Sequence, residues 1–206
     1  CTNSGSVRFS GGITAFTFGG LAGTRNIALS NEVGAAIALT VGGNNSDTVY
    51  SGALSAGGSL TKVGTGTLTL AGTNTYTGTT SLTNGTLALG CDNALNSGSR
   101  LVVSGGTFNA GTRSNTLQRL VVTGAGTLAL GDGSCHLAFA DSSEAWTGTL
   151  EVTGNMGPTS LRFGTNASGL TPAQLDSITV GGKKVWLELN AQGYLRRMVG
   201  TLMRMY

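Results

Sequence analysis

The chain has 206 residues, of which 39% are hydrophobic and only 10% are charged, and its formal net charge is +3. Its 35 glycines accompany only 2 prolines, which excludes a collagen helix, and the apolar content argues against a disordered linker. The excess positive charge falls after residue 180 instead of following a face with aromatic platforms, so the sequence argues against nucleic-acid binding. No segment approaches the ~18 apolar residues of a membrane-spanning helix, and we expect no transmembrane segment.

The first quarter of the chain carries short alternating segments between turns rich in glycine and asparagine. Residues 16–18 and 27–29 are brief examples, and residues 37–41 alternate well before a turn at 42–45. Alternation with a period of two residues indicates a β-strand with one buried face. We interpret residues 1–57 as irregular turns of the repeat that follows.

One motif recurs five times from residue 66 on, namely Gly-Thr followed by alternating apolar residues. Its glycines are Gly66, Gly85, Gly106, Gly126 and Gly148, at intervals of 19, 21, 20 and 22 residues. In each copy the apolar residues are expected to point inward and the threonine outward. The inward pairs are Leu68/Leu70, Leu87/Leu89, Phe108/Ala110, Leu128/Leu130 and Leu150/Val152, and the outward residues are Thr67, Thr86, Thr107, Thr127 and Thr149.

A second strand precedes the motif in several copies, at residues 101–103 and 120–122 and more weakly at 80–82. Two or three short strands per ~20 residues describe one rung of a parallel β-helix (β-solenoid), with rungs stacked ~4.8 Å apart. The apolar residues then form internal ladders, and the five threonines form an external one. Because a single rung cannot bury its own core, stability comes from neighbouring rungs. The predicted fold class is all-β.

The segment at residues 170–178 has the signals of a helix start. Thr171 is placed as the N-cap with Pro172 at the first helical position and Gln174 completing a capping box, and Leu170 and Leu175 stand at the hydrophobic staple positions. We expect a short helix that closes the end of the solenoid, followed by strands at 185–189 and 193–195. The predicted regions are rungs at 1–162, a C-terminal cap at 163–197 and an apolar, basic tail at 198–206.

Residues 58–90 read GSLTKVGTGTLTLAGTNTYTGTTSLTNGTLALG. This stretch resembles the autotransporter-associated β-strand repeat family, the passenger repeats of bacterial surface proteins. Residues 163–164, 170–175 and 192–195 resemble the closing segment of such passengers. The resemblance implies a right-handed parallel β-helix outside a Gram-negative cell, in adhesion or as a stalk.

We therefore predict a non-catalytic, extracellular structural or adhesive element of the cell surface without a cofactor or metal. The expected partner is a host or surface glycan or protein. Two alternatives remain, a glycan-cleaving β-helix enzyme and a phage-type spike. The enzyme alternative depends on Asp132, Asp141, Glu144 and Glu151, which fall within about one rung's length. Glycosidase carboxyl groups stand ~5–5.5 Å apart in retaining and ~6.5–9.5 Å in inverting enzymes, and adjacent rungs allow either distance.

The single histidine and the cysteines favour structural interpretations. His136 is the only histidine, so we expect it to be packed or solvated instead of catalytic. Cys91 and Cys135 both follow similar strands two rungs apart, which places them ~9–10 Å apart along the stack. That separation exceeds the ~6.8 Å limit between the Cα atoms of a disulfide. We predict that these two cysteines are not bonded to each other.

The tail at 198–206 is the candidate for assembly. The open ends of a solenoid expose strand edges that invite pairing, and head-to-tail contacts that do not close generate filaments. We expect self-association through the ends, by a tail that either folds back or adds a strand to a neighbour. The candidate residues are Met198, Val199, Leu202, Met203 and Tyr206.

Overall fold

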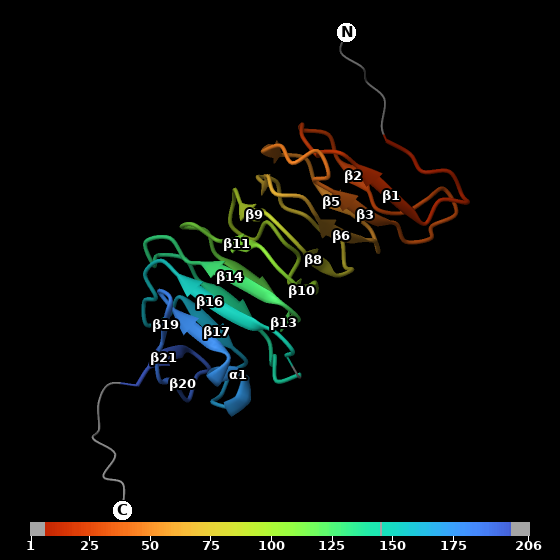
Figure 1. The fold of residues 1–206 in the computed structure, drawn as a ribbon. Helices are drawn as coiled ribbons and strands as arrows, with labels where there is room; N and C mark the ends of the chain where they lie inside the picture. The colour runs from red at the N-terminus through yellow and green to blue at the C-terminus, as the bar shows by residue number, and fades with distance from the viewer. Residues whose placement is uncertain (1–6, 145, 199–206) are drawn as a thin grey trace, which may run out of the picture.

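The computed structural model describes residues 7–144 and 146–198, which coil into a parallel β-solenoid of about seven turns with about 21 residues per turn. Strands that neighbour each other in a sheet come from successive turns, so the sheets run along the rod, with β1 near one extremity and β21 near the other (Figure 1). The predicted all-β parallel solenoid is confirmed. The helix within the described residues, α1 (Pro172–Asp176), has five residues, and none there could span a bilayer.

Two long sheets form two sides of the coil. The six-stranded sheet has the order β1-β3-β6-β8-β10-β13 and consists of Ala15–Phe18, Ala38–Val41, Ser59–Lys62, Thr80–Leu82, Arg100–Val103 and Arg119–Val122. The eight-stranded sheet has the order β19-β18-β16-β14-β11-β9-β7-β4 and consists of Lys183–Lys184, Ile178–Val180, Thr149–Thr153, Ala125–Ala129, Thr107–Asn109, Thr86–Leu89, Thr67–Leu70 and Thr48–Tyr50.

Shorter sheets complete the coil. One contains β12 (Asn115–Leu117), β15 (Leu137–Phe139) and β17 (Leu161–Phe163), and another pairs β2 (Ile27–Ala28) with β5 (Leu54–Ser55). These pairings are parallel. At the C-terminal end, β20 (Leu187–Leu189) pairs antiparallel with β21 (Leu195–Arg197), and β19 pairs antiparallel with β18.

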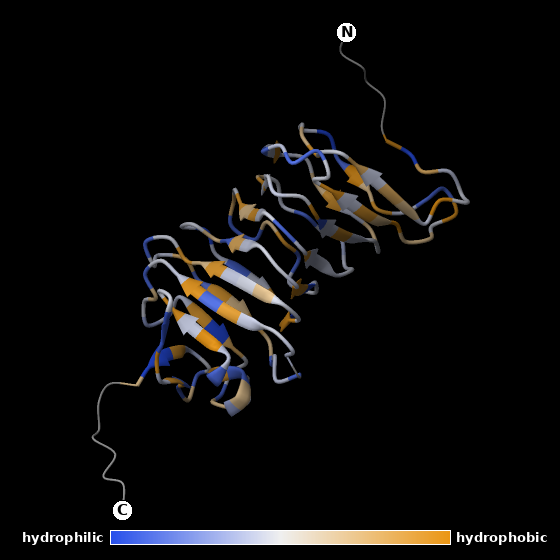
Figure 2. Ribbon diagram, viewed as in Figure 1, coloured by the Kyte–Doolittle hydropathy of each residue, from blue (hydrophilic) through white to orange (hydrophobic). Residues whose placement is uncertain are grey.

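The core consists of inward residues stacked in register from turn to turn. Hydrophobic and polar residues alternate along the strands, as Figure 2 shows for β14 and β16. One inner row of the eight-stranded sheet runs through residues that are at most 1% exposed, namely Leu68, Leu87, Phe108, Leu128 and Val152. Burial along such rows supplies the stability that no single rung has.

One inner row also contains a lysine. Lys62 is 1% exposed and stands in register between Val41 and Leu82. Its ammonium group donates to the carbonyl oxygens of Val63 (2.6 Å), Gly64 (3.0 Å) and Asn84 (3.4 Å). Burial lowers the pKa of Lys62, and the nearby carboxylate of Asp47 opposes that shift.

In the last copy of the repeat, the strand is shifted by two residues from the register that its sequence suggests. Thr149 stands beside Ala125, and Thr127 stands beside Glu151. The expected place of Thr149 on the threonine ladder is therefore wrong. Because side chains alternate between faces, a shift of two residues keeps every residue on its predicted face. Leu150 lies beside Gly126, where an added Cβ atom would stand 2.2 Å from Val103 Cγ1.

The helix signals at residue 171 are confirmed. Thr171 is the N-cap of α1, its side chain accepts from Gln174 N, and the Gln174 side chain accepts from Thr171 N. The helix is followed by β18, which returns to the eight-stranded sheet and pairs in parallel with β16. The parallel stack therefore extends beyond residue 162, where the predicted rungs end and the predicted cap begins.

Candidate functional site

The outward row of threonines lies on the outer face of the eight-stranded sheet. Thr67, Thr86, Thr107 and Thr127 are half-buried and stand in register on successive strands. Glu151 and then Thr179 continue the row. The Glu151 carboxylate accepts hydrogen bonds from the Thr179 hydroxyl and from Gly182 N. The Glu151 carboxylate within this row thus already has partners.

Two of the four acidic residues considered for glycan cleavage stabilise their own turns. Asp132 accepts from the backbone N (2.9 Å) and the hydroxyl (2.6 Å) of Ser134, and these bonds lower the pKa of Asp132. Asp141 accepts from Ser143 N (2.9 Å), and hydrogen bonding by Ser143 lowers its pKa as well. The general acid of a glycosidase needs a raised pKa. Both shifts run in the opposite direction.

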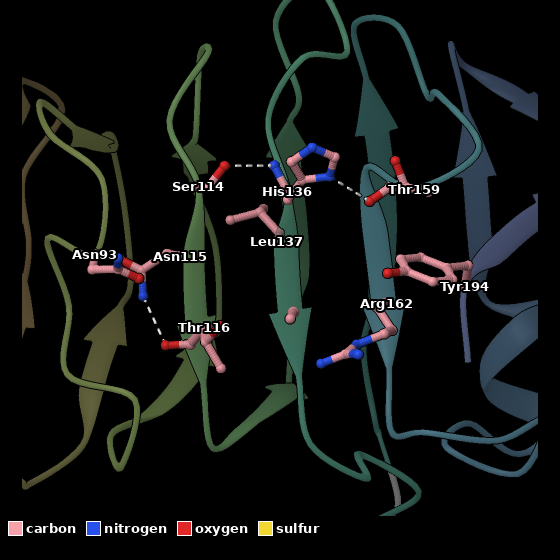
Figure 3. A pocket seen from close by; sticks show the side chains of 10 residues that line it. Asn93, Ser114, Asn115, Thr116, His136, Leu137, Thr159, Arg162 and Tyr194 are labelled. Atoms are coloured by element: carbon pink, nitrogen blue, oxygen red, sulfur yellow. Dashed lines mark hydrogen bonds between the residues drawn. The ribbon is translucent and has the colours of Figure 1, made fainter. Parts of the chain in front are cut away.

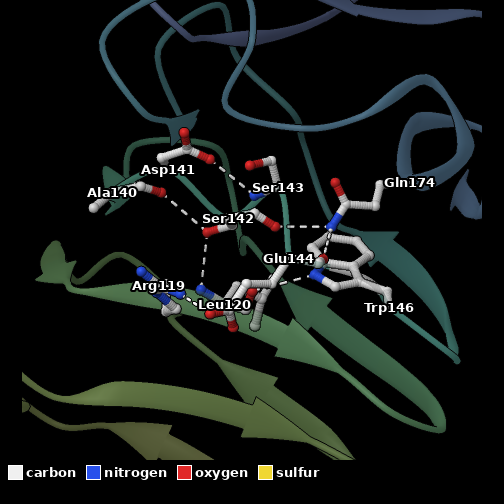
Figure 4. Close-up of polar contacts among 9 residues, drawn as sticks. All are labelled: Arg119, Leu120, Ala140, Asp141, Ser142, Ser143, Glu144, Trp146 and Gln174. Atoms are coloured by element: carbon white, nitrogen blue, oxygen red, sulfur yellow. Dashed lines mark hydrogen bonds and ion pairs between the residues drawn. The ribbon is translucent and has the colours of Figure 1, made fainter.

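The third acid, Glu144, belongs to a network that joins the loop after β15 to the helix α1 (Figure 4). Its carboxylate forms an ion pair with Arg119. The buried Gln174 side chain donates to the carbonyl oxygens of Ser142 (2.8 Å) and Glu144 (2.6 Å). These contacts hold the loop against the cap and leave Glu144 in a supporting role.

The aromatic residue in this loop does not form an open platform. Trp146 donates from its ring nitrogen to Leu120 O (3.2 Å), and its ring centroid lies 6.3 Å from that of Phe163 in an edge-on arrangement. It packs against the hydrophobic core. A sugar-stacking role would require a ring with an accessible face, which this packing does not favour.

A groove of about 230 Å³ lies over the short sheet of β12, β15 and β17. Its outward row consists of Thr116, Ala138 and Arg162, which stand in register on the three strands, and an isolated antiparallel bridge joins Arg162 to Tyr194. The other lining residues are Asn93, Ser114, Asn115, His136, Leu137 and Thr159. This groove was not predicted from the sequence, because its residues belong to five separate segments of the chain and share no motif.

One wall of the groove is fixed by hydrogen bonds around His136. Its backbone N donates to the Ser114 hydroxyl (3.1 Å), and its ring Nδ1 lies 3.0 Å from Thr159 O. Because a carbonyl oxygen only accepts, Nδ1 carries the hydrogen and Nε2 of the neutral ring is an acceptor. Of the two structural positions expected for His136, packed or solvated, the residue takes the solvated one, because it is exposed.

Another part of the lining consists of a cation and an aromatic ring. The Arg162 guanidinium carbon lies 5.9 Å from the centroid of the Tyr194 ring. Figure 3 shows the Arg162 side chain extending from β17 toward β15, with the Tyr194 hydroxyl directed the same way. Within the described part of the chain, no carboxylate forms an ion pair with Arg162.

The candidates for assembly are only partly described. Met198 is 52% exposed, and its backbone N donates to Trp186 O (2.9 Å). Trp186 is 76% exposed and is not among the residues predicted for assembly. The other candidates, Val199, Leu202, Met203 and Tyr206, lie outside the described residues.

The described cysteines are both free. Cys91 is half-buried, whereas Cys135 is buried and its thiol donates to Leu130 O (3.4 Å). Burial raises the pKa of the Cys135 thiol, so this group is a poor nucleophile. In the described ranges, no three His, Cys, Asp or Glu residues are grouped so that they could hold a metal ion.

Comparison with known proteins gives one finding. Residues 60–89, which span β6 to β9, match the family model described as Passenger-associated-transport-repeat. No curated protein and no solved structure matches the chain. Such a repeat implies secretion to the cell surface or outside the cell. The chain thus carries a passenger-associated transport repeat within a β-solenoid, an arrangement typical of autotransporter passenger domains.

Proposed function

We propose that this chain is a non-catalytic structural and adhesive segment of a cell-surface passenger. The main support is the state of the four acids that a glycan-cleaving β-helix would use. Asp132 and Asp141 stabilise turns, Glu144 pairs with Arg119, and Glu151 holds Thr179 and Gly182. A surface of hydroxyl groups and an open groove on a stack of paired strands suit binding better than bond cleavage.

The experiment tests adhesion and cleavage together. The purified chain, coated on beads, is offered to surfaces carrying acidic or neutral polysaccharides, and reducing ends are measured in the same samples. We expect bead attachment that is lost on unfolding the chain, without release of reducing ends. Release of reducing ends that Glu144→Gln or Asp132→Asn abolishes in a folded protein would instead establish the enzyme alternative.

A second proposal is that the solenoid assembles end to end. Phe16, 38% exposed, lies on β1 at the edge of the six-stranded sheet. Trp186 and Met198 are exposed and directly flank β20 and β21. These two strands lie near the opposite end of the rod (Figure 1). Apolar side chains at both ends support a head-to-tail contact, which does not close and therefore produces fibres.

Light scattering tests the assembly. The intact chain is expected to form particles that grow with concentration, whereas Trp186→Ser and a chain lacking residues 198–206 should stay smaller. Electron microscopy of the same samples distinguishes fibres from trimers, which the spike alternative would produce. Equal particle sizes for the three proteins would rule out a role for this end.

A further inference from the structure

We propose that the groove over β12, β15 and β17, hereafter the Arg162 groove, binds a carboxylate-bearing sugar unit of an acidic polysaccharide. The inference rests on the proposed adhesive function and specifies its ligand. It depends on three observations, namely an arginine without a carboxylate partner, walls of neutral hydrogen-bonding groups, and a floor that is small and rigid.

Arg162 supplies the charge. Its side chain is half-buried on β17, and its guanidinium carbon lies 5.9 Å from the centroid of the Tyr194 ring. No acidic residue is among the ten described residues that line the groove. Asp92, which precedes the lining residue Asn93 in the sequence, accepts from Ser114 N (2.9 Å) and so already has a partner. A guanidinium offers a planar pair of N–H donors that matches a carboxylate in two parallel hydrogen bonds.

The other groups suit the hydroxyls of a sugar. In the neutral ring His136 Nε2 accepts, because Nδ1 donates to Thr159 O. The hydroxyl groups of Thr116, Thr159 and Tyr194 can both donate and accept. A ligand with several hydroxyl groups and one negative charge satisfies this set, whereas an apolar ligand would leave most of it without partners.

The floor gives the groove its size. Ala138 stands between Thr116 and Arg162 in the outward row, so a methyl group separates two longer side chains. The volume of about 230 Å³ is below the ~300–1,000 Å³ of pockets for drug-sized ligands, which favours a single sugar unit of a longer chain. The strands below are held in register by parallel pairing, so the groups are positioned before binding.

Other anionic polymers fit less well. A single-stranded nucleic acid requires several cations with aromatic platforms between them, and this groove has one arginine and one tyrosine. A phosphate group is usually held by several donors, often backbone N–H groups of a nest or helix end. The groove instead places one guanidinium beside neutral hydroxyl groups.

The test is an NMR titration of the folded chain with four probes. Glucuronate has the ring and the charge, glucuronamide has the ring without the charge, and acetate and inorganic phosphate have charge without the ring. We expect saturable shifts of the amides of β15 and β17 with glucuronate, and at least ~10-fold weaker binding of the other three. Equal binding of phosphate or acetate would show a simple anion site, and no saturable binding of glucuronate would also overturn the proposal.

Variants locate the site. Arg162→Gln removes the charge and should weaken glucuronate binding at least ~10-fold, whereas Tyr194→Phe should weaken it by a smaller factor. Arg100→Gln is the matched control, because Arg100 is also a half-buried arginine on a strand and lies on the six-stranded sheet. Unchanged binding by Arg162→Gln, or an equal loss with Arg100→Gln, contradicts the assignment. Thermal unfolding of each variant verifies that it is folded.

The two proposals fail separately. Bead attachment that persists in Arg162→Gln, with no release of reducing ends, leaves the adhesive function standing and removes this groove as its site. Release of reducing ends with glucuronate binding intact removes the non-catalytic function but leaves the groove as a binding site.

Discussion

The middle rungs and the last rungs of this solenoid bury the same kind of core with very different lengths of chain. Between Thr67 and Thr127 the register advances by 19, 21 and 20 residues per rung. From Thr127 to Glu151 it advances by 24, and from Glu151 to Thr179 by 28. The extra residues leave the coil as the loop after β15 and as the helix α1. A rung can therefore vary in length, provided that the inward and outward alternation of its strands is kept.

The regular middle rungs and the irregular last rungs also differ in what their outer surfaces present. The middle rungs present flat outer rows of threonine, alanine and asparagine on the eight-stranded sheet. The Arg162 groove takes Arg162 from β17 and Tyr194 from the segment before β21, both beyond the regular repeats. Regular rungs thus provide a stable rod, and irregular rungs provide side chains that differ from their neighbours.

The largest expected effect lies where the two regions meet. Leu128 is fully buried and stands in register between Phe108 and Val152. Leu128→Ala should lower the free energy of unfolding by about 2–5 kcal/mol, through lost burial and the cavity left behind. Thr127→Ala, on the outer face, should cost well under ~1 kcal/mol. Denaturant unfolding measures both, and equal losses would contradict the assignment of faces.

The next largest effect is expected in the cap. Gln174→Ala should cost about 1–3 kcal/mol, because it leaves the Ser142 and Glu144 carbonyl oxygens without their donor and removes half of the capping box. Hydrogen exchange should rise first in α1 and in the loop after β15, while the middle rungs stay protected. Gln118→Ala, at an exposed position, is the control. Uniform loss of protection along the rod would show that the two regions unfold as one.

A smaller effect is expected at Lys62 in the middle rungs. Lys62→Met keeps the apolar stem but removes the donor to three carbonyl oxygens, and it should cost about 1–2 kcal/mol at neutral pH. Lys183→Met, at an exposed position, should be neutral. A gain in stability from Lys62→Met would mean that the cost of burying the ammonium group exceeds its hydrogen bonds.

The same residue gives a pH dependence. Burial lowers the pKa of Lys62 below its ordinary value of 10.5. In the window between the lowered pKa and 10.5 the unfolded chain binds more protons than the folded chain, so stability rises with pH there. The native protein should therefore gain stability relative to Lys62→Met as pH rises toward 10.5. A difference that stays constant or shrinks in urea unfolding at several pH values would contradict this assignment.

The sequence predicts the regular middle rungs better than the irregular last rungs. Repeated residues such as Leu68 and Leu87 face inward because a period of two in sequence is a period of two in a strand, and Thr171 caps a helix because its signals are local. The residue that stands beside Thr149 on the adjacent strand depends on the length of the preceding loop. No local sequence pattern predicts how many residues of that loop lie outside the coil. Arg162 and Tyr194 meet only because the chain folds back after β18. A lysine is usually found at the surface, so its residue type does not predict the burial of Lys62, which stands in an internal row.

The register at β16 can be tested by disulfide formation instead of by a measurement of stability. In a background of Cys91→Ser, one variant combines Thr127→Cys with Glu151→Cys, and a second combines Thr127→Cys with Thr149→Cys. Residues 127 and 151 are direct neighbours on parallel strands, about 4.8 Å apart, which lies within the ~4.4–6.8 Å range of disulfide Cα atoms. Residue 149 is two positions along the strand, which makes its distance from 127 about 8 Å. We expect mild oxidation to close the first pair in the folded protein and to leave the second open, as measured by thiol labelling and peptide mass. Closure of the second pair alone would restore the register suggested by the Gly-Thr motifs and show that the rung between β14 and β16 has 22 residues instead of 24.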